Sequence, residues 1–286
     1  MNENSLQEPV ARIASTDSVT VPLFRLGARA ERAVLVAHAT GFHGRSYQPL
    51  AAALSRLEAW APDLRGHGDA SSPASGRYHW QGFADDVLAV VDWLDRPLLA
   101  CGHSMGGAAL LLAEIRRPGS FEAIYCWEPI VYPPRIQLLG DSPLVERTRR
   151  RRDTFASLEE AIANFAAKPP LDALHPDALR AYVEHGFERL PGGERCLKLP
   201  AAEEAEVYRM SLRHEAFARL GEVRCPVTVA HGRRDGVGPA EVAGEVAAAL
   251  PRGRLESWED LGHFGPLEDP ARVGAAVERA LLDPPW

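Results

Sequence analysis

A serine between two glycines is the residue of this 286-residue chain whose setting most clearly predicts chemistry. Gly102, Ser104 and Gly106 form a G-x-S-x-G pattern after the apolar run Leu98–Gly102 and before a helical stretch that begins at Met105. A strand-to-helix turn of this kind is so tight that a flanking Cβ would collide with its neighbours, and the serine is strained. The glycine spacing differs from the G-x-G-x-x-G of a dinucleotide site. We therefore interpret Ser104 as a nucleophile.

Two backbone N–H groups could stabilise the negative charge that such a nucleophile creates on the substrate oxygen. The helix after the serine begins at Met105, where free N–H groups and the helix dipole favour an anion. A second donor is expected at Thr40, in the small-residue turn that follows His38. We interpret His38 and His43 as residues that hold this turn by hydrogen bonding, although either could touch the substrate.

The expected general base is a histidine near the C-terminus. His263 lies in a predicted loop between the strand Arg254–Ser257 and the helix Ala271–Leu281. A loop histidine after the final strand can reach across the top of the sheet, take the proton of Ser104 and later protonate the leaving group. The order of serine first and histidine last agrees with this assignment.

Two carboxylates compete for the role of the acid that orients this histidine. Asp235 follows the strand Val227–Ala230, which is the usual place for such an acid. Glu128 follows the strand Ala123–Trp127, and a carboxylate there can also point toward the histidine. Residue order alone favours Asp235 only weakly, so both remain candidates.

Short apolar runs that alternate with amphipathic stretches indicate the elements that position these residues. The pattern predicts strands at Ala33–Ala37, Leu98–Gly102, Ala123–Trp127, Val227–Ala230 and Arg254–Ser257. It predicts helices at Ser46–Leu57, Trp80–Leu94, Met105–Arg116, Ala240–Leu250 and Ala271–Leu281. Alternation of this type is typical of an α/β fold with a doubly wound, mostly parallel sheet.

The interval 132–220 breaks the alternation. It contains amphipathic segments at 160–167, 178–187 and 202–212 but no convincing strand, and it predicts a helical cap. The core domain that contains the sheet would then consist of residues 1–131 and 221–286. Within the cap, the basic run Arg149–Arg152 is interpreted as a solvated helix face, with a nucleic-acid contact as the weaker alternative.

The composition of the chain limits the classes of binding partner that we expect. The formal net charge of -7 gives no electrostatic reason to expect nucleic acid or an acidic membrane. No stretch approaches the roughly 20 apolar residues that span a bilayer, and the first ten residues lack an apolar signal segment. We expect a soluble, cytoplasmic protein, and a homodimer is compatible with the sequence. The four cysteines show no C-x-x-C pairing and indicate neither disulfides nor a zinc site.

Taken together, the motifs resemble those of the α/β-hydrolase superfamily over nearly the whole chain. The resemblance rests on His38-Ala-Thr-Gly-Phe, Asp63-Leu-Arg-Gly-His-Gly-Asp, Gly102-His-Ser-Met-Gly and Leu261-Gly-His-Phe. It implies an eight-stranded, mostly parallel sheet, a cap over the active site and no cofactor or metal. It also implies that the turn from Asp63 to Asp69 is mainly architectural.

The chain departs from this resemblance at two points. Many relatives read His-Gly where this chain has His38 and Ala39, which would alter the approach of that loop. The position of Glu128 looks like the acid position of zearalenone-type lactonases and of a haloalkane dehalogenase subgroup. Dehalogenases and epoxide hydrolases of this fold use aspartate as the nucleophile, and Ser104 argues against both.

The leading hypothesis is therefore a serine hydrolase that cleaves a carboxylic ester or lactone of a small apolar substrate through an acyl-enzyme. A perhydrolase or acyltransferase would use the same acyl-enzyme with another acceptor. A ligand receptor with this fold and little turnover is the alternative from another class. The candidate residues for the substrate pocket are His38, Phe42, Tyr47, Trp80, Trp127 and Ile130.

Overall fold

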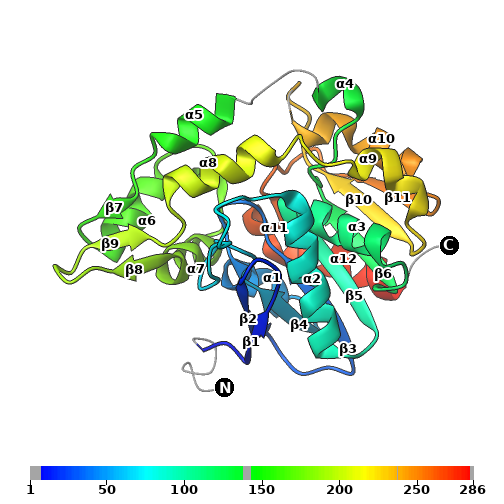
Figure 1. The fold of residues 1–286 in the computed structure, drawn as a ribbon, viewed down its shortest axis with the longest axis horizontal. Coiled ribbons are helices and arrows are strands. Elements are labelled where there is room, and N and C mark those ends of the chain that lie inside the picture. The colour runs from blue at the N-terminus through cyan, green and yellow to red at the C-terminus, as the bar shows by residue number, and fades with distance from the viewer. Residues whose placement is uncertain (1–7, 138–142, 237, 284–286) are drawn as a thin grey trace.

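Eight strands pair into one sheet in the order β1-β2-β4-β3-β5-β6-β10-β11 (Figure 1). This computed structural model describes residues 8–137, 143–236 and 238–283. The strands are β1 (Ala11–Ala14), β2 (Thr20–Leu26), β3 (Arg32–Ala37), β4 (Leu57–Pro62), β5 (Leu98–His103), β6 (Ala123–Trp127), β10 (Val227–His231) and β11 (Gly253–Ser257). Pairing is antiparallel from β1 to β2 and from β2 to β4, and parallel across the rest. The predicted doubly wound, mostly parallel sheet is confirmed.

Helices cover both faces of this sheet because its buried strands are apolar on both sides. In β3, Leu35 packs into one core with helices α2 and α3, whereas its neighbours Val34 and Val36 face a second core with α1 and α12. The helices of the sheet domain are η2 (Gly44–Tyr47), α1 (Gln48–Ala52), α2 (Trp80–Leu94), α3 (Met105–Arg116), η5 (Pro239–Val242), α10 (Ala243–Ala249), α11 (Gly265–Glu268) and α12 (Pro270–Leu282). The expected bounds of α2 and α3 are confirmed.

The sequence pattern failed on the N-terminal side of the sheet. Strands β1, β2 and β4 were not expected, and the helix expected to reach Leu57 ends at Ala52. The reason in β4 is a buried carboxylate that interrupts the apolar run. Glu58 accepts hydrogen bonds from Trp60 Nε1 at 3.1 Å and from Arg96 Nη1 at 3.0 Å, which satisfies its charge inside the sheet.

Within the chain between β6 and β10, residues 143–210 form a layer beside the sheet, whereas residues 216–222 pack against the sheet domain (Figure 1). The helices between β6 and β10 are α4 (Pro134–Gln137), α5 (Pro143–Arg149), α6 (Leu158–Ala166), η3 (Leu171–Ala173), α7 (Pro176–Gly186), α8 (Ala201–Met210), α9 (Ala216–Arg219) and η4 (Leu220–Glu222). The expectation that this interval has no strand was wrong. The strands β7 (Thr154–Phe155), β8 (Phe187–Arg189) and β9 (Arg195–Leu197) pair antiparallel. Strands of two or three residues are too short to show the alternation by which strands are recognised.

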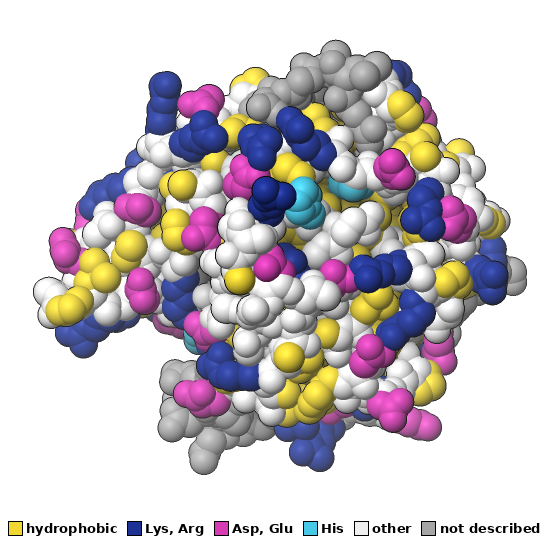
Figure 2. Space-filling model, viewed as in Figure 1, with side chains coloured by type: hydrophobic (Ala, Val, Ile, Leu, Met, Phe, Trp, Pro, Cys, Tyr) yellow, Lys and Arg dark blue, Asp and Glu magenta, His cyan; other side chains and the backbone are white. Residues whose placement is uncertain are grey.

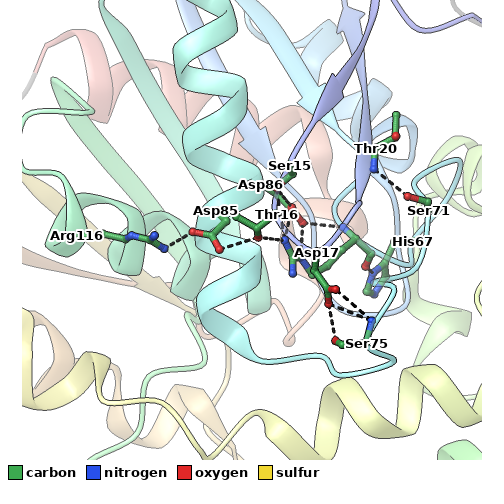
Figure 3. Close-up of polar contacts among 11 residues, drawn as sticks. Ser15, Thr16, Asp17, Thr20, His67, Ser71, Ser75, Asp85, Asp86 and Arg116 are labelled. Atoms are coloured by element: carbon green, nitrogen blue, oxygen red, sulfur yellow. Dashed lines mark hydrogen bonds and ion pairs between the residues drawn. The ribbon is translucent and has the colours of Figure 1, made fainter.

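A buried ion pair joins the turn after β4 to helix α2, and the N-terminal hairpin is hydrogen-bonded to the same carboxylate. Arg65 donates to both carboxylate oxygens of Asp86, from Nε at 2.9 Å and from Nη2 at 2.7 Å. Ser15 Oγ donates to the same carboxylate at 2.6 Å, and Figure 3 shows how Ser15 and Thr16 converge on Asp85 and Asp86 of α2. These contacts agree with the architectural role expected of the turn from Asp63 to Asp69.

The described helices are short, and none of them combines the length and apolarity needed to cross a membrane. All four cysteines are free, and Cys101, Cys126 and Cys225 are buried as small apolar side chains. The N-terminal segment on which the expectation of no signal rested lies mostly outside the described residues, since these begin at residue 8.

Candidate active site

Ser104 occupies the turn between β5 and α3 in a strained conformation. Its φ of 55° and ψ of -114° lie in a region that residues with a Cβ rarely adopt. The flanking glycines permit this turn, because a Cβ on Gly106 would lie 2.2 Å from the carbonyl oxygen of Ala37 and a Cβ on Gly102 would lie 2.6 Å from Gly107 Cα. The serine side chain therefore stands at the C-terminal edge of the sheet.

His263 meets this serine from the loop between β11 and α11. Its Nε2 lies 3.2 Å from Ser104 Oγ. Its Nδ1 lies 2.6 Å from Glu128 Oε2, and a carboxylate can only accept, so the Nδ1 proton is the one donated. Nε2 is then free to accept the serine proton, as a general base must.

Glu128 is held rigidly at the end of β6. Its carboxylate is buried, and Oε1 accepts the backbone N–H of Gly232 at 2.8 Å while Oε2 contacts His263. The backbone takes the left-handed φ of 44°, which is unusual for a residue with a Cβ. Its own N–H donates to Ala230 O at 2.8 Å, and this bond fixes the turn to the neighbouring strand β10.

The weak preference for Asp235 does not agree with this geometry. Asp235 is exposed in the loop after β10, whereas Glu128 contacts the histidine directly. Both ring nitrogens of His263 are already engaged, one by Glu128 and the other by Ser104. An additional carboxylate is therefore not needed to set the tautomer.

The two expected oxyanion donors flank the serine. Thr40 lines the same cavity as Ser104 and lies in a turn closed by Phe42 N donating to Ala39 O at 3.2 Å. Met105 is the first residue of α3, where a backbone N–H has no partner inside the helix. These positions agree with the requirement for two converging donors, and their role in binding an oxyanion stays a prediction.

A buried chain of hydrogen bonds, which the sequence did not reveal, joins the two loops around Ser104. Ala39 N donates to Tyr47 Oη at 3.1 Å, and Tyr47 Oη lies 2.7 Å from His103 Nδ1. His103 Nε2 lies 2.9 Å from the carbonyl oxygen of His263 and must carry the proton, because a carbonyl only accepts. Burial also holds the pKa of His103 well below its ordinary value, so the ring is neutral.

Removal of the Tyr47 hydroxyl tests this chain. Tyr47→Phe leaves the Ala39 N–H and His103 Nδ1 unpaired, and we expect a loss of about 1–3 kcal/mol in the free energy of unfolding. Because the chain ends at the loops that carry Thr40 and His263, the rate of fluorophosphonate labelling of Ser104 should also fall.

The control for this variant is Tyr125→Phe, which removes another buried hydroxyl, bonded to Glu256 at 3.3 Å. A comparable loss of stability in both variants with an equal rate of labelling would show that Tyr47 only supports the fold.

A cavity of about 1040 Å³ opens above Ser104 and His263, and its lining is mainly apolar. Of the predicted pocket residues, Phe42, Trp80 and Ile130 line it. The segment between β6 and β10 contributes most of the remaining wall, and its residues were not predicted from the sequence. They include Tyr132, Phe165, Leu171, Tyr182, Tyr208 and Leu212. Amphipathic cap helices show which residues are apolar, but not which of them face a cavity rather than a core.

Three predicted pocket residues lie outside this lining because each is used in the fold. His38 is fully buried and links Ala39 O at 2.9 Å to Leu64 N at 2.9 Å. Tyr47 belongs to the hydrogen-bonded chain described above. Trp127 is fully buried below the loop of His263 and packs on Trp258 with ring centroids 5.9 Å apart.

The described part of the chain contains no group of three or more His, Cys, Asp or Glu side chains that could hold a metal ion.

Comparison with known proteins supports this description of the fold. The sequence profile of the "Alpha/beta hydrolase family" matches residues 34–276. The chain is 29% identical to Lipase LipV of Mycobacterium tuberculosis over 269 residues, which cover 91% of this chain and 97% of that protein. It is 33% identical to Monoglyceride lipase of Homo sapiens over 105 residues, or 34% of this chain and 35% of that enzyme.

Solved structures show the same architecture. E-2-(Acetamidomethylene)succinate Hydrolase aligns with a TM-score of 0.77 at 21% identity, covering 96% of this chain and 99% of that chain. A thermophilic esterase from Thermogutta terrifontis aligns with a TM-score of 0.70 at 20% identity, covering 95% of this chain and 97% of that chain. The matched profile spans most of the sheet and the segment between β6 and β10, and the chain belongs to the alpha/beta hydrolase family.

Proposed function

We propose that this hydrolase cleaves carboxylic esters or lactones through an acyl-enzyme on Ser104. The observation that carries the proposal is the unbroken contact from Glu128 through His263 to Ser104, with bond lengths of 2.6 and 3.2 Å, at the floor of a large apolar cavity. Similarity to two lipases supports an ester as the bond that is cleaved. The intact contacts favour catalysis over a receptor that only binds its ligand.

In the first half of the reaction, Ser104 Oγ attacks the carbonyl carbon and passes its proton to His263 Nε2. The Glu128 carboxylate stabilises the imidazolium that forms. The N–H groups of Thr40 and Met105 stabilise the negative oxygen of the tetrahedral intermediate. When the intermediate collapses, the carbon–oxygen bond to the alcohol breaks, and His263 gives its proton to the departing oxygen.

In the second half, a water molecule replaces the alcohol. His263 Nε2 takes a proton from this water, whose oxygen attacks the acyl carbon, and a second tetrahedral intermediate forms. Its collapse breaks the bond to Ser104 Oγ, which recovers its proton from His263, and the carboxylic acid is released. In a lactone, the alcohol and the acid belong to one molecule, and the same steps open the ring.

The cavity is suited to an acyl group with apolar carbons. Phe42 and Trp80 contribute aromatic surface from the sheet domain, and Phe165 and Leu171 contribute apolar surface from the cap. Burying apolar carbons against such walls contributes roughly 25 cal/mol for each Å² removed from water. This favourable binding free energy comes from carbons away from the scissile bond, so the reacting atoms need not contribute to it.

A fluorophosphonate probe together with a panel of 4-nitrophenyl esters and five- and six-membered lactones tests the function. We expect saturable hydrolysis of at least one ester series and covalent labelling of the peptide that contains Ser104, because only an activated serine reacts quickly with the probe. Absence of both hydrolysis and labelling, in protein that unfolds cooperatively on heating, would overturn the proposal.

A further inference from the structure

One face of the cap helix α5 is turned toward the cavity. The residues of this face and of the turn that follows it are Leu144, Arg147, Thr148 and Arg151, and all four line the cavity. Their spacing of three or four residues places them on one side of a helix. The basic run Arg149–Arg152 is thus not simply a solvated face, because Arg151 points inward.

Arg151 is anchored by buried partners close to Ser104. It forms an ion pair with Glu204 of α8, and its Nη2 donates to Tyr182 Oη at 2.9 Å. Burial raises the pKa of Glu204, and the neighbouring guanidinium opposes this shift. Glu204 in turn touches the turn that carries Thr40, since a Cβ on Gly41 would lie 2.5 Å from Glu204 Oε1. The charges of Arg151 and Glu204 compensate each other.

Two further cations in the cavity wall have only uncharged partners. Arg147 Nη2 lies 3.5 Å from the carbonyl oxygen of Pro169, and Lys168 Nζ donates to Asn164 Oδ1 at 2.5 Å. Because Pro169 follows Lys168, the guanidinium lies beside the segment that carries the ammonium group. Among the described residues, no carboxylate lies within ion-pair distance of either side chain.

Of the run Arg149–Arg152, only the exposed Arg150 forms no ion pair within the described residues. Arg149 pairs with Glu146 and Arg152 pairs with Glu160. The outer surface over α5 and α8 likewise carries Lys and Arg side chains with Asp and Glu side chains between them (Figure 2). The chain as a whole has a formal net charge of -7. Arg147 and Lys168 are both exposed and both line the cavity, so their positive charge is available to a ligand that occupies it.

We propose that the substrate of this enzyme is an ester whose end remote from the scissile bond carries a carboxylate, which Arg147 and Lys168 bind. This inference rests on the proposed function and narrows its substrate class. A carboxylate that reaches both cations would accept charge-assisted hydrogen bonds from the guanidinium and the ammonium group. The apolar wall between Ser104 and the cap accommodates the methylene spacer.

Two esters that differ only at the remote end test the proposal. Mono-4-nitrophenyl adipate and 4-nitrophenyl hexanoate have the same leaving group and the same acyl length, but only the first carries a carboxylate. In Arg147→Gln and in Lys168→Gln, we expect the ratio of kcat/KM for adipate over hexanoate to fall about 2- to 5-fold each, mainly through KM. The ratio of the wild type should also fall as salt screens the contact.

Arg149→Gln is the matched control, because it removes the same charge from the same helix at a residue that is paired with Glu146 and does not line the cavity. Its ratio should equal that of the wild type. An unchanged ratio in both Arg147→Gln and Lys168→Gln would overturn the inference. An equal drop in all three variants would also overturn it, because it would indicate a general electrostatic attraction of the anionic ester rather than a specific contact.

Failure of the proposed function is a separate result. If neither ester is hydrolysed and Ser104 is not labelled, the function is wrong. Calorimetric titration of adipate still tests the subsite: binding weakened in Arg147→Gln supports it, and binding equal in wild type and Arg147→Gln, or undetectable in both, overturns it.

Discussion

Replacement of Ser104 by alanine is expected to reduce kcat by about five to six orders of magnitude while the protein remains folded. Among the described residues, Ser104 Oγ is the nucleophilic atom that contacts His263 Nε2. The flanking glycines keep the turn open, so the smaller alanine side chain fits. Initial rates with the best ester of the panel, and the melting temperature of the variant, measure the two parts of this expectation.

Ser120→Ala serves as the control for this variant, since Ser120 lies beyond α3 and its Oγ donates to Arg117 O at 2.7 Å. It should retain the activity of the wild type. Wild-type turnover in Ser104→Ala, or probe labelling that persists in it, would contradict the proposed nucleophile.

The second large effect is expected at Glu128. Glu128→Gln should lower kcat by about three to four orders of magnitude. The amide oxygen can still accept the N–H of Gly232, but the amide N–H would then face His263 Nδ1. This arrangement favours the tautomer with its proton on Nε2, which cannot accept the proton of Ser104. Steady-state kinetics on the variant measure the loss.

Asp235→Asn provides the comparison, because it makes the same chemical change at the carboxylate that residue order favoured. We expect its kcat to stay within about tenfold of the wild type, since Asp235 is exposed and Glu128 occupies His263 Nδ1. A loss of kcat by about three to four orders of magnitude in Asp235→Asn, with near-normal kcat in Glu128→Gln, would show that Asp235 is the acid that orients His263. Small losses in both would show that another group orients His263.

Local spacing was sufficient to predict the turn at Ser104. The turn requires glycines at fixed offsets, and the bounds of α3 follow from the apolar stretch after it. The strands β5, β6 and β10 could also be predicted, because buried parallel strands are continuous apolar runs. Where a strand contains a satisfied buried charge, as β4 does at Glu58, this signal is lost.

Long-range contacts could not be predicted in the same way. The choice between Glu128 and Asp235 depends on side-chain direction at two neighbouring strand ends, and the left-handed φ of Glu128 has no signature in a residue of that type. The contacts of Tyr47 with His103, and of Arg151 with Glu204, each join residues more than 50 positions apart. Only the assembled fold brings such pairs together.

The place of Glu128 at the end of β6 has a consequence for how specificity can evolve. Because β5 and β6 pair directly, the proposed nucleophile Ser104 and the proposed acid Glu128 follow neighbouring strands of one sheet. In the proposed mechanism, Gly232 at the start of the loop after β10 holds Glu128, but the later residues Gly236, Pro239 and Glu241, which border the cavity, have no part in it. Insertions or exchanges in this loop can reshape the entrance for new substrates while the reacting atoms keep their positions.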